Sequence, residues 1–97
     1  MKPKLITFFM NPVKTAEISN LEAIRSPALL VFPERVEANV DRMLDMVAVD
    51  ASRLRPHVKT HKMAEVVRLQ VAKGITRFKC ATIAEAEMTA ISGGSDV

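Results

Sequence analysis

Strand-like runs alternate with helix-like stretches over residues 27–97, and this order constrains the fold more than any other feature of the sequence. Continuous apolar or β-rich runs predict buried strands, and apolar residues that recur every three or four positions predict helices. The expected strands are 28–32, 54–58 and 77–81, with the start of another at 96–97, and the expected helices are 33–49, 62–73 and 82–91. Such alternation implies parallel strands joined by crossover helices.

The spacing of the expected strands favours one α/β fold. Successive strands begin about twenty residues apart, which is short enough for the repeat of a (β/α)8 TIM-type barrel. A doubly wound sheet is the competing fold, but the sequence contains neither a P-loop nor a GxGxxG fingerprint that would favour it. A closed barrel needs eight strands and about 250 residues. We therefore expect the 97 residues to form the first part of such a barrel, incomplete in this chain.

Local signals mark the boundaries of the domain and of its helices. Residues 1–26 carry no clear period, so we expect an N-terminal arm, followed by the first βα units at 27–97, truncated at the C-terminus. Pro33 suits the first position of a helix, and Gly74 suits a left-handed cap after one. Thr82 and Glu85 form a capping box, in which Glu85 is expected to reach back to the backbone N–H of Thr82.

Composition excludes several classes of protein. The chain is 48% hydrophobic and 26% charged, as a globular domain is, and its net charge of +3 is spread among acidic residues without a basic block for nucleic acid. No apolar segment approaches the ~20 residues of a membrane span, and the run 5–10 is shorter than a secretory signal core. A single cysteine, Cys80, cannot form an intrachain disulfide and is expected to be a buried small side chain. We expect a cytoplasmic protein.

Lys59 occupies the position where alternating strand–helix folds carry their chemistry. Reactive groups gather at the C-terminal ends of the strands, and Lys59 follows Val58 directly and precedes the next helix. Position alone leaves an ordinary solvated lysine as the alternative, because lysine is mostly exposed. His57 and His61 have the four-residue spacing of two zinc ligands on a helix, but they straddle a strand end and a loop. Structural roles are therefore favoured for both histidines.

The residues around Lys59 resemble a known family. The matching residues are 26–31, Asn39, the run Arg-Pro-His-Val-Lys-Thr-His-Lys at 55–62, 80–82 and 85–87. Together they are similar to the N-terminal part of the D-threonine aldolase and D-serine dehydratase group, which belongs to the alanine racemase-like, fold type III pyridoxal phosphate (PLP) enzymes. The resemblance spans 18–97. One departure is Phe32–Pro33, where family members often carry an acidic residue.

The resemblance implies a PLP-binding barrel followed by a mostly β domain. Lys59 would form the Schiff base with pyridoxal 5'-phosphate as a neutral amine, a form that the positive charge of neighbours such as Lys62 would favour. His57 and Arg55 would be weaker contacts of the cofactor. A divalent metal (Mn, Mg or Zn) is also implied, with ligands outside this chain and none within it.

The expected function is that of a PLP-dependent lyase acting on D-3-hydroxy amino acids. The first candidate is D-threonine aldolase-like cleavage of the Cα–Cβ bond to glycine and an aldehyde. The alternatives are a D-serine dehydratase, an amino-acid racemase of the same fold, and a non-catalytic PLP-binding homeostasis protein. The expected partner is a small D-amino acid, and the full-length enzyme is expected to be a homodimer. The 97-residue stretch by itself is expected to be inactive.

Overall fold

The computed structural model describes residues 17–97, which fall into two units, the second being Val31–Val97. In the first unit the described residues contain one short 3-10 helix, η1 (Leu21–Ala23), closed by a hydrogen bond from the N–H of Ala23 to the carbonyl of Asn20 (2.9 Å). Most of the expected arm, 1–16, lies outside the described residues. The division into arm and barrel units therefore stays a prediction.

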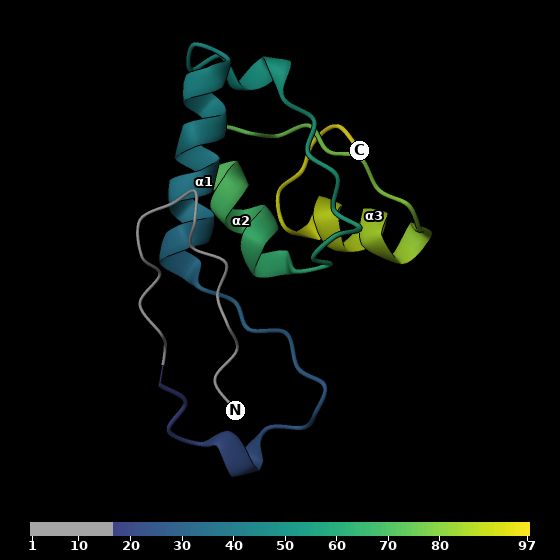
Figure 1. Ribbon diagram of the computed structural model, residues 1–97. Coiled ribbons are helices and arrows are strands. Elements are labelled where there is room, and N and C mark those ends of the chain that lie inside the picture. The colour runs from purple at the N-terminus through teal and green to yellow at the C-terminus, as the bar shows by residue number, and fades with distance from the viewer. Residues whose placement is uncertain (1–16) are drawn as a thin grey trace. The chain divides into compact units, whose positions relative to one another are not determined.

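The second unit contains three helices in the expected order. They are α1 (Pro33–Met46), α2 (Ala64–Ala72) and α3 (Ile83–Ile91), with a 3-10 turn, η2 (Ala51–Arg53), after α1. The helix α2 contacts both α1 and α3 (Figure 1). Within residues 17–97, no helix has the length and apolar character needed to cross a membrane. The alternation of helices with extended segments is confirmed.

Three extended segments lie parallel, but none is long enough to count as a strand within the described part of the chain. Isolated parallel bridges join His57 to Lys79 and Arg77 to Asp96. The N–H of Val58 donates to the carbonyl of Lys79 (2.9 Å), and the N–H of Lys79 donates to the carbonyl of Pro56 (2.9 Å). The prediction of strands at 54–58 and 77–81 was therefore wrong, because these segments form only single bridges and no barrel sheet within residues 17–97. Pro56 has no N–H to donate, and the chain turns away after Val58, so this pairing cannot lengthen.

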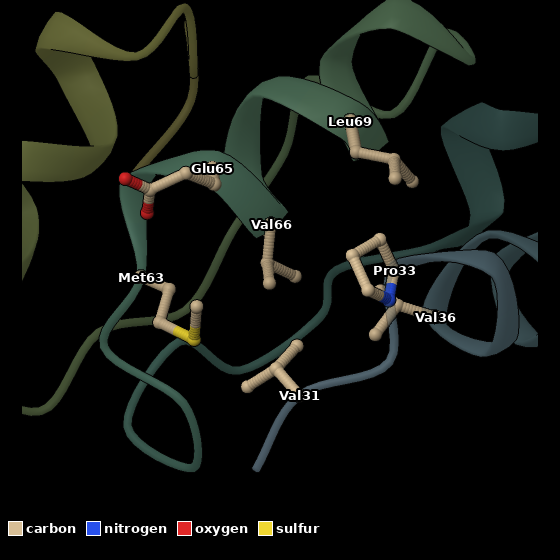
Figure 2. A pocket seen from close by; sticks show the side chains of 7 residues that line it. All are labelled: Val31, Pro33, Val36, Met63, Glu65, Val66 and Leu69. Carbon is tan, nitrogen blue, oxygen red and sulfur yellow. The ribbon is translucent and has the colours of Figure 1, made fainter. Parts of the chain in front are cut away.

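The prediction of a buried strand at 28–32 was wrong. These residues pair with no other described segment, and the side chain of Leu29 is 73% exposed. An apolar run forms a strand only where a neighbouring strand accepts its hydrogen bonds, and the described residues offer none here. Val31 instead borders an apolar groove of about 210 Å³ (Figure 2). The other residues that line it are Pro33, Val36, Met63, Glu65, Val66 and Leu69.

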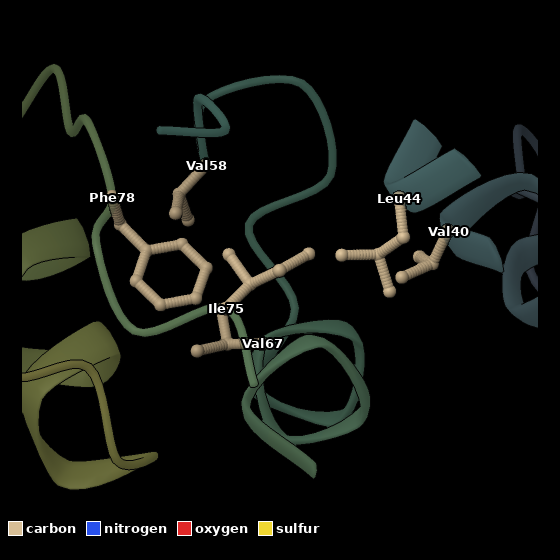
Figure 3. Packing of buried hydrophobic residues seen from close by; sticks show 6 residues of the cluster. All are labelled: Val40, Leu44, Val58, Val67, Ile75 and Phe78. Atoms are coloured by element: carbon tan, nitrogen blue, oxygen red, sulfur yellow. The ribbon is translucent and has the colours of Figure 1, made fainter. Parts of the chain in front are cut away.

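A buried cluster holds the second unit together (Figure 3). Val58, Val67, Ile75 and Phe78 are fully buried, and Leu44 of α1 points toward them. Burying each such side chain contributes about 1.5–3 kcal/mol. Val58 and Phe78 come from the first two extended segments, so the cluster fixes those segments against the helices.

Each helix ends in a Schellman motif, the paired hydrogen bonds that satisfy its last carbonyls. After α2 the left-handed residue is the expected Gly74 (φ 95), and after α3 it is Gly93 (φ 108). After α1 the same pattern uses Ala48 (φ 54) and Val49 (φ 62), whose N–H donates to the carbonyl of Leu44 (2.8 Å). The helix α1 therefore ends at Met46, before the predicted Val49, although no glycine marks its end.

A glycine at position 48 should stabilise the protein. Alanine is disfavoured in the left-handed region by about 1–2 kcal/mol, while glycine costs roughly 0.5–1 kcal/mol of extra chain entropy. We expect Ala48→Gly to raise the free energy of unfolding in urea by roughly 0.5–1 kcal/mol. The control is Ala38→Gly, at an exposed position within α1, which should lower the free energy of unfolding by about 1 kcal/mol. Loss of stability in both variants would contradict the left-handed assignment.

Candidate functional site

Lys59 lies in a tight turn that leaves the first extended segment. The carbonyl of Val58 accepts hydrogen bonds from the N–H of His61 (3.2 Å) and of Lys62 (2.9 Å), which closes the turn around Lys59 and Thr60. Val58 is completely buried, whereas the side chain of Lys59 is exposed. The turn therefore exposes the amine of Lys59 to solvent, while Val58, the first residue of the turn, is fixed in the core.

Two histidines stabilise this turn by accepting backbone hydrogen bonds at Nδ1. The Nδ1 of His57 accepts from the N–H of Lys59 (3.2 Å), and the Nδ1 of His61 accepts from the N–H of Met63 (3.0 Å). Met63 precedes α2, which has no other side-chain cap, so His61 takes that role. An accepting Nδ1 places the proton of a neutral imidazole on Nε2. The structural role expected for His61 agrees with this contact.

The extended segments separate apolar from charged side chains. Successive side chains of an extended chain point to opposite faces, so Arg55 and His57 share the face opposite to buried Val58. On the neighbouring segment, Arg77 and Lys79 likewise alternate with buried Phe78. The face opposite to the core is consequently rich in positive charge. Lys79 has no ion-pair partner among the described residues.

Arg55 binds across all three extended segments. Its guanidinium forms a two-pronged ion pair with the carboxylate of Asp96 (2.9 and 2.6 Å) and donates to the carbonyl of Phe78 (3.0 Å). Arg77 also approaches Asp96 (3.3 Å). The hydrogen bond from Arg55 is the main cause that lowers the pKa of Asp96. Arg55 begins its segment, whereas Lys59 follows the end, so contact of Arg55 with a cofactor stays a prediction.

Glu85 is a buried carboxylate at the start of α3. Its backbone N–H donates to Oγ1 of Thr82 (3.1 Å), which confirms one half of the predicted capping box. The other half was misplaced by one residue, because Oε1 of Glu85 accepts from the N–H of Ala81 (3.0 Å). Its Oε2 lies 3.8 Å from Nζ of Lys62. No sequence signal connects Glu85 with Lys62, so this approach was missed.

Cys80 packs beside the core but is only half-buried. Its Sγ lies 3.5 Å from the hydroxyl oxygen of Thr89. The predicted small core side chain is thus confirmed in its packing, although its burial is incomplete. Among residues 17–97, no group of three or more His, Cys, Asp or Glu side chains is arranged to hold a metal ion.

Comparison with known proteins gives one partial similarity. The chain is 34% identical over 77 residues to the D-threo-3-hydroxyaspartate dehydratase of Delftia sp. (strain HT23). The matched residues make up 79% of this chain but 20% of that protein, so the chain spans about a fifth of its relative's length. No family model matches the chain, and no solved structure does. The similarity is distant and at the level of a fragment.

Acid should destabilise the protein through His61. Burial lowers the pKa of His61 below its ordinary 6.5. As the pH falls from 6.5 toward this lower pKa, the unfolded chain takes up the proton first, so stability is lost in that window. His61→Asn keeps an acceptor for the N–H of Met63 but cannot titrate. We expect urea unfolding to show a smaller loss of stability between about pH 7 and pH 5 in the variant. An equal loss in both proteins would contradict the neutral, half-buried state of His61.

Proposed function

We propose that the chain supplies the covalent anchor of a PLP-dependent lyase acting on D-3-hydroxy amino acids, and that Lys59 is this anchor. The observation that carries the proposal is the run 55–62, whose lysine stands exposed on a turn closed by the carbonyl of buried Val58. Activated lysine amines are the groups that bind a cofactor aldehyde covalently. The partial similarity to a dehydratase of a D-3-hydroxy amino acid supports the same reaction class.

The residues around Lys59 fit the chemical parts of PLP. An aldehyde requires a primary amine, and the exposed side chain of Lys59 offers one. A phosphate requires positive charge that is not already neutralised. Lys79 meets that need on the segment bridged to His57, whereas Arg55 and Arg77 are held by Asp96. Lysine serves as a point charge for phosphate, so Lys79 is the side chain in this set best suited to it.

In the proposed reaction, the residues of this chain position the amine of Lys59 and hold the cofactor. When bound, PLP supplies an electron sink for the bond that breaks at the amino-acid substrate. The turn fixes the backbone of Lys59 through His57 Nδ1 and the carbonyl of Val58, which limits where the amine can reach. His57 is proposed as a cofactor contact because it adjoins Lys59 on the charged face. The corresponding role for Arg55 would require it to leave Asp96.

Two reactions are open to such a lyase. The sequence favours aldol cleavage as the first candidate, and the dehydratase similarity specifically favours elimination of water as the second. Both would use the same lysine anchor and the same class of substrate. A divalent metal, as the family resemblance implies, would take its ligands from outside this chain.

Chemical trapping tests the anchor. We expect borohydride reduction of the chain with PLP to label Lys59 selectively, as shown by mapping the modified peptide, because its turn is preorganised. Lys59→Arg should abolish this label. Lys73→Arg, at a lysine that pairs with Glu37 and Asp41, should retain it as the matched control. Labelling spread evenly over the exposed lysines, or concentrated on another lysine, would reject Lys59 as the anchor.

Product analysis separates the reactions. The full-length protein is given PLP and Mn²⁺, Mg²⁺ or Zn²⁺ and offered D-threonine, D-serine or D-threo-3-hydroxyaspartate. Glycine with an aldehyde would identify aldol cleavage, and ammonia with a 2-oxo acid would identify dehydration. We expect lyase products that disappear in Lys59→Arg, because the substrate amine must displace this lysine. A racemised substrate without either product set would contradict the lyase proposal.

A further inference from the structure

The turn that carries Lys59 ends at a residue with an unfavourable backbone conformation. Lys62 has φ 52, in the left-handed region, and its N–H donates to the carbonyl of Val58. A residue with a side chain adopts this region at a cost, so surrounding contacts must hold it there. His61 contributes one such contact through the N–H of Met63 (3.0 Å). The side chain of Lys62 contributes another.

That second contact is with a carboxylate buried on a different element. Glu85 is only 5% exposed, and its Oε1 is fixed by the N–H of Ala81. Its Oε2 is enclosed and accepts no hydrogen bond within the described structure. A buried carboxylate oxygen without a donor is costly unless a positive charge lies near it. Lys62 supplies that charge, with Nζ at 3.8 Å from Oε2.

The groups that face Glu85 keep it ionised. The hydrogen bond from Ala81 is the largest cause that lowers the pKa of Glu85, and Thr82 and the positive charge of Lys62 lower it further, while burial opposes them. The same neighbourhood forms a hollow of about 230 Å³ lined by Lys62, Thr82, Ala84, Glu85 and Met88. Oε2 itself is enclosed, and a small movement of Lys62 would bring Nζ from 3.8 Å into hydrogen-bonding range.

We infer that Glu85 is a positioning residue for Lys59. Through its ion pair with Lys62, Glu85 fixes the last residue of the 58–62 turn, and the turn then determines where the amine of Lys59 lies. The inference rests on the proposed function of Lys59 for its chemical meaning. The contact between Glu85 of α3 and Lys62 of the turn does not depend on that proposal, because it exists whatever Lys59 binds. Glu85 touches neither cofactor nor substrate in this role.

Glu85→Gln and Lys62→Met test the inference. Gln keeps an acceptor for Ala81 and removes the charge, while Met keeps the stem of a side chain that is 64% exposed. We expect each variant to slow PLP attachment to Lys59 about fivefold, the upper size for such an ion pair, and the double variant to be no slower than either. Lys62→Arg should restore most of the rate. The amide hydrogens of His61 and Lys62 should exchange faster in the slow variants.

The exposed pair Glu65 and Arg68 provides the matched control, because its atoms are also 3.8 Å apart but it joins two residues of α2 and none of the 58–62 turn. Glu65→Gln and Arg68→Met should leave both measurements unchanged. If the unmodified chain labels Lys59 and Glu85→Gln labels it equally fast, the positioning role is overturned. If the unmodified chain does not label Lys59, the proposed function fails instead. Amide exchange then decides the inference by itself, and unchanged exchange in both Glu85→Gln and Lys62→Met overturns it.

Discussion

The burial of Val58 is the constraint on which the rest of the site depends. Its side chain lies in the core with Phe78 and Ile75, while its backbone makes three hydrogen bonds. The N–H pairs with the next extended segment, and the carbonyl accepts twice from the following turn. One residue therefore joins the apolar cluster, the parallel pairing and the turn that presents Lys59. Displacing Val58 would disturb all three together.

The two faces of the extended segments differ in character, one apolar and buried and the other charged. One face contributes Val58 and Phe78 to the core, and the other carries basic side chains. Asp96 offsets part of this positive charge by binding Arg55 and Arg77, and in doing so it connects the first segment to the third. Within residues 17–97, Lys79 has no ion-pair partner, and it lies on the segment that is bridged to His57, which is close to Lys59 in the chain. The ion pairs with Asp96 thus lie at one end of the segments, and the proposed site of the anionic cofactor lies at the other.

The helices were largely predictable because their signals are local. Apolar periodicity placed α1, α2 and α3, and Gly74 and Gly93 marked two of the three ends. The end of α1 was missed by three residues, because Ala48 and Val49 adopt left-handed conformations for which neither residue type has a preference. The run at 28–32 was misassigned for a different reason. Apolar composition describes what a segment can bury, whereas a strand also needs a partner.

The sequence by itself determined the order of helices and extended segments, the capping role of Thr82 and the position of Lys59 just after an extended segment. These features arise from interactions between residues a few positions apart. Only the tertiary structure decided that Arg55 binds Asp96, that Glu85 approaches Lys62, and that the extended segments pair through single bridges. Such contacts join residues far apart in the chain, and packing around Val58 and Phe78 brings them together. No local pattern encodes that packing, because it depends on how several elements fill one core.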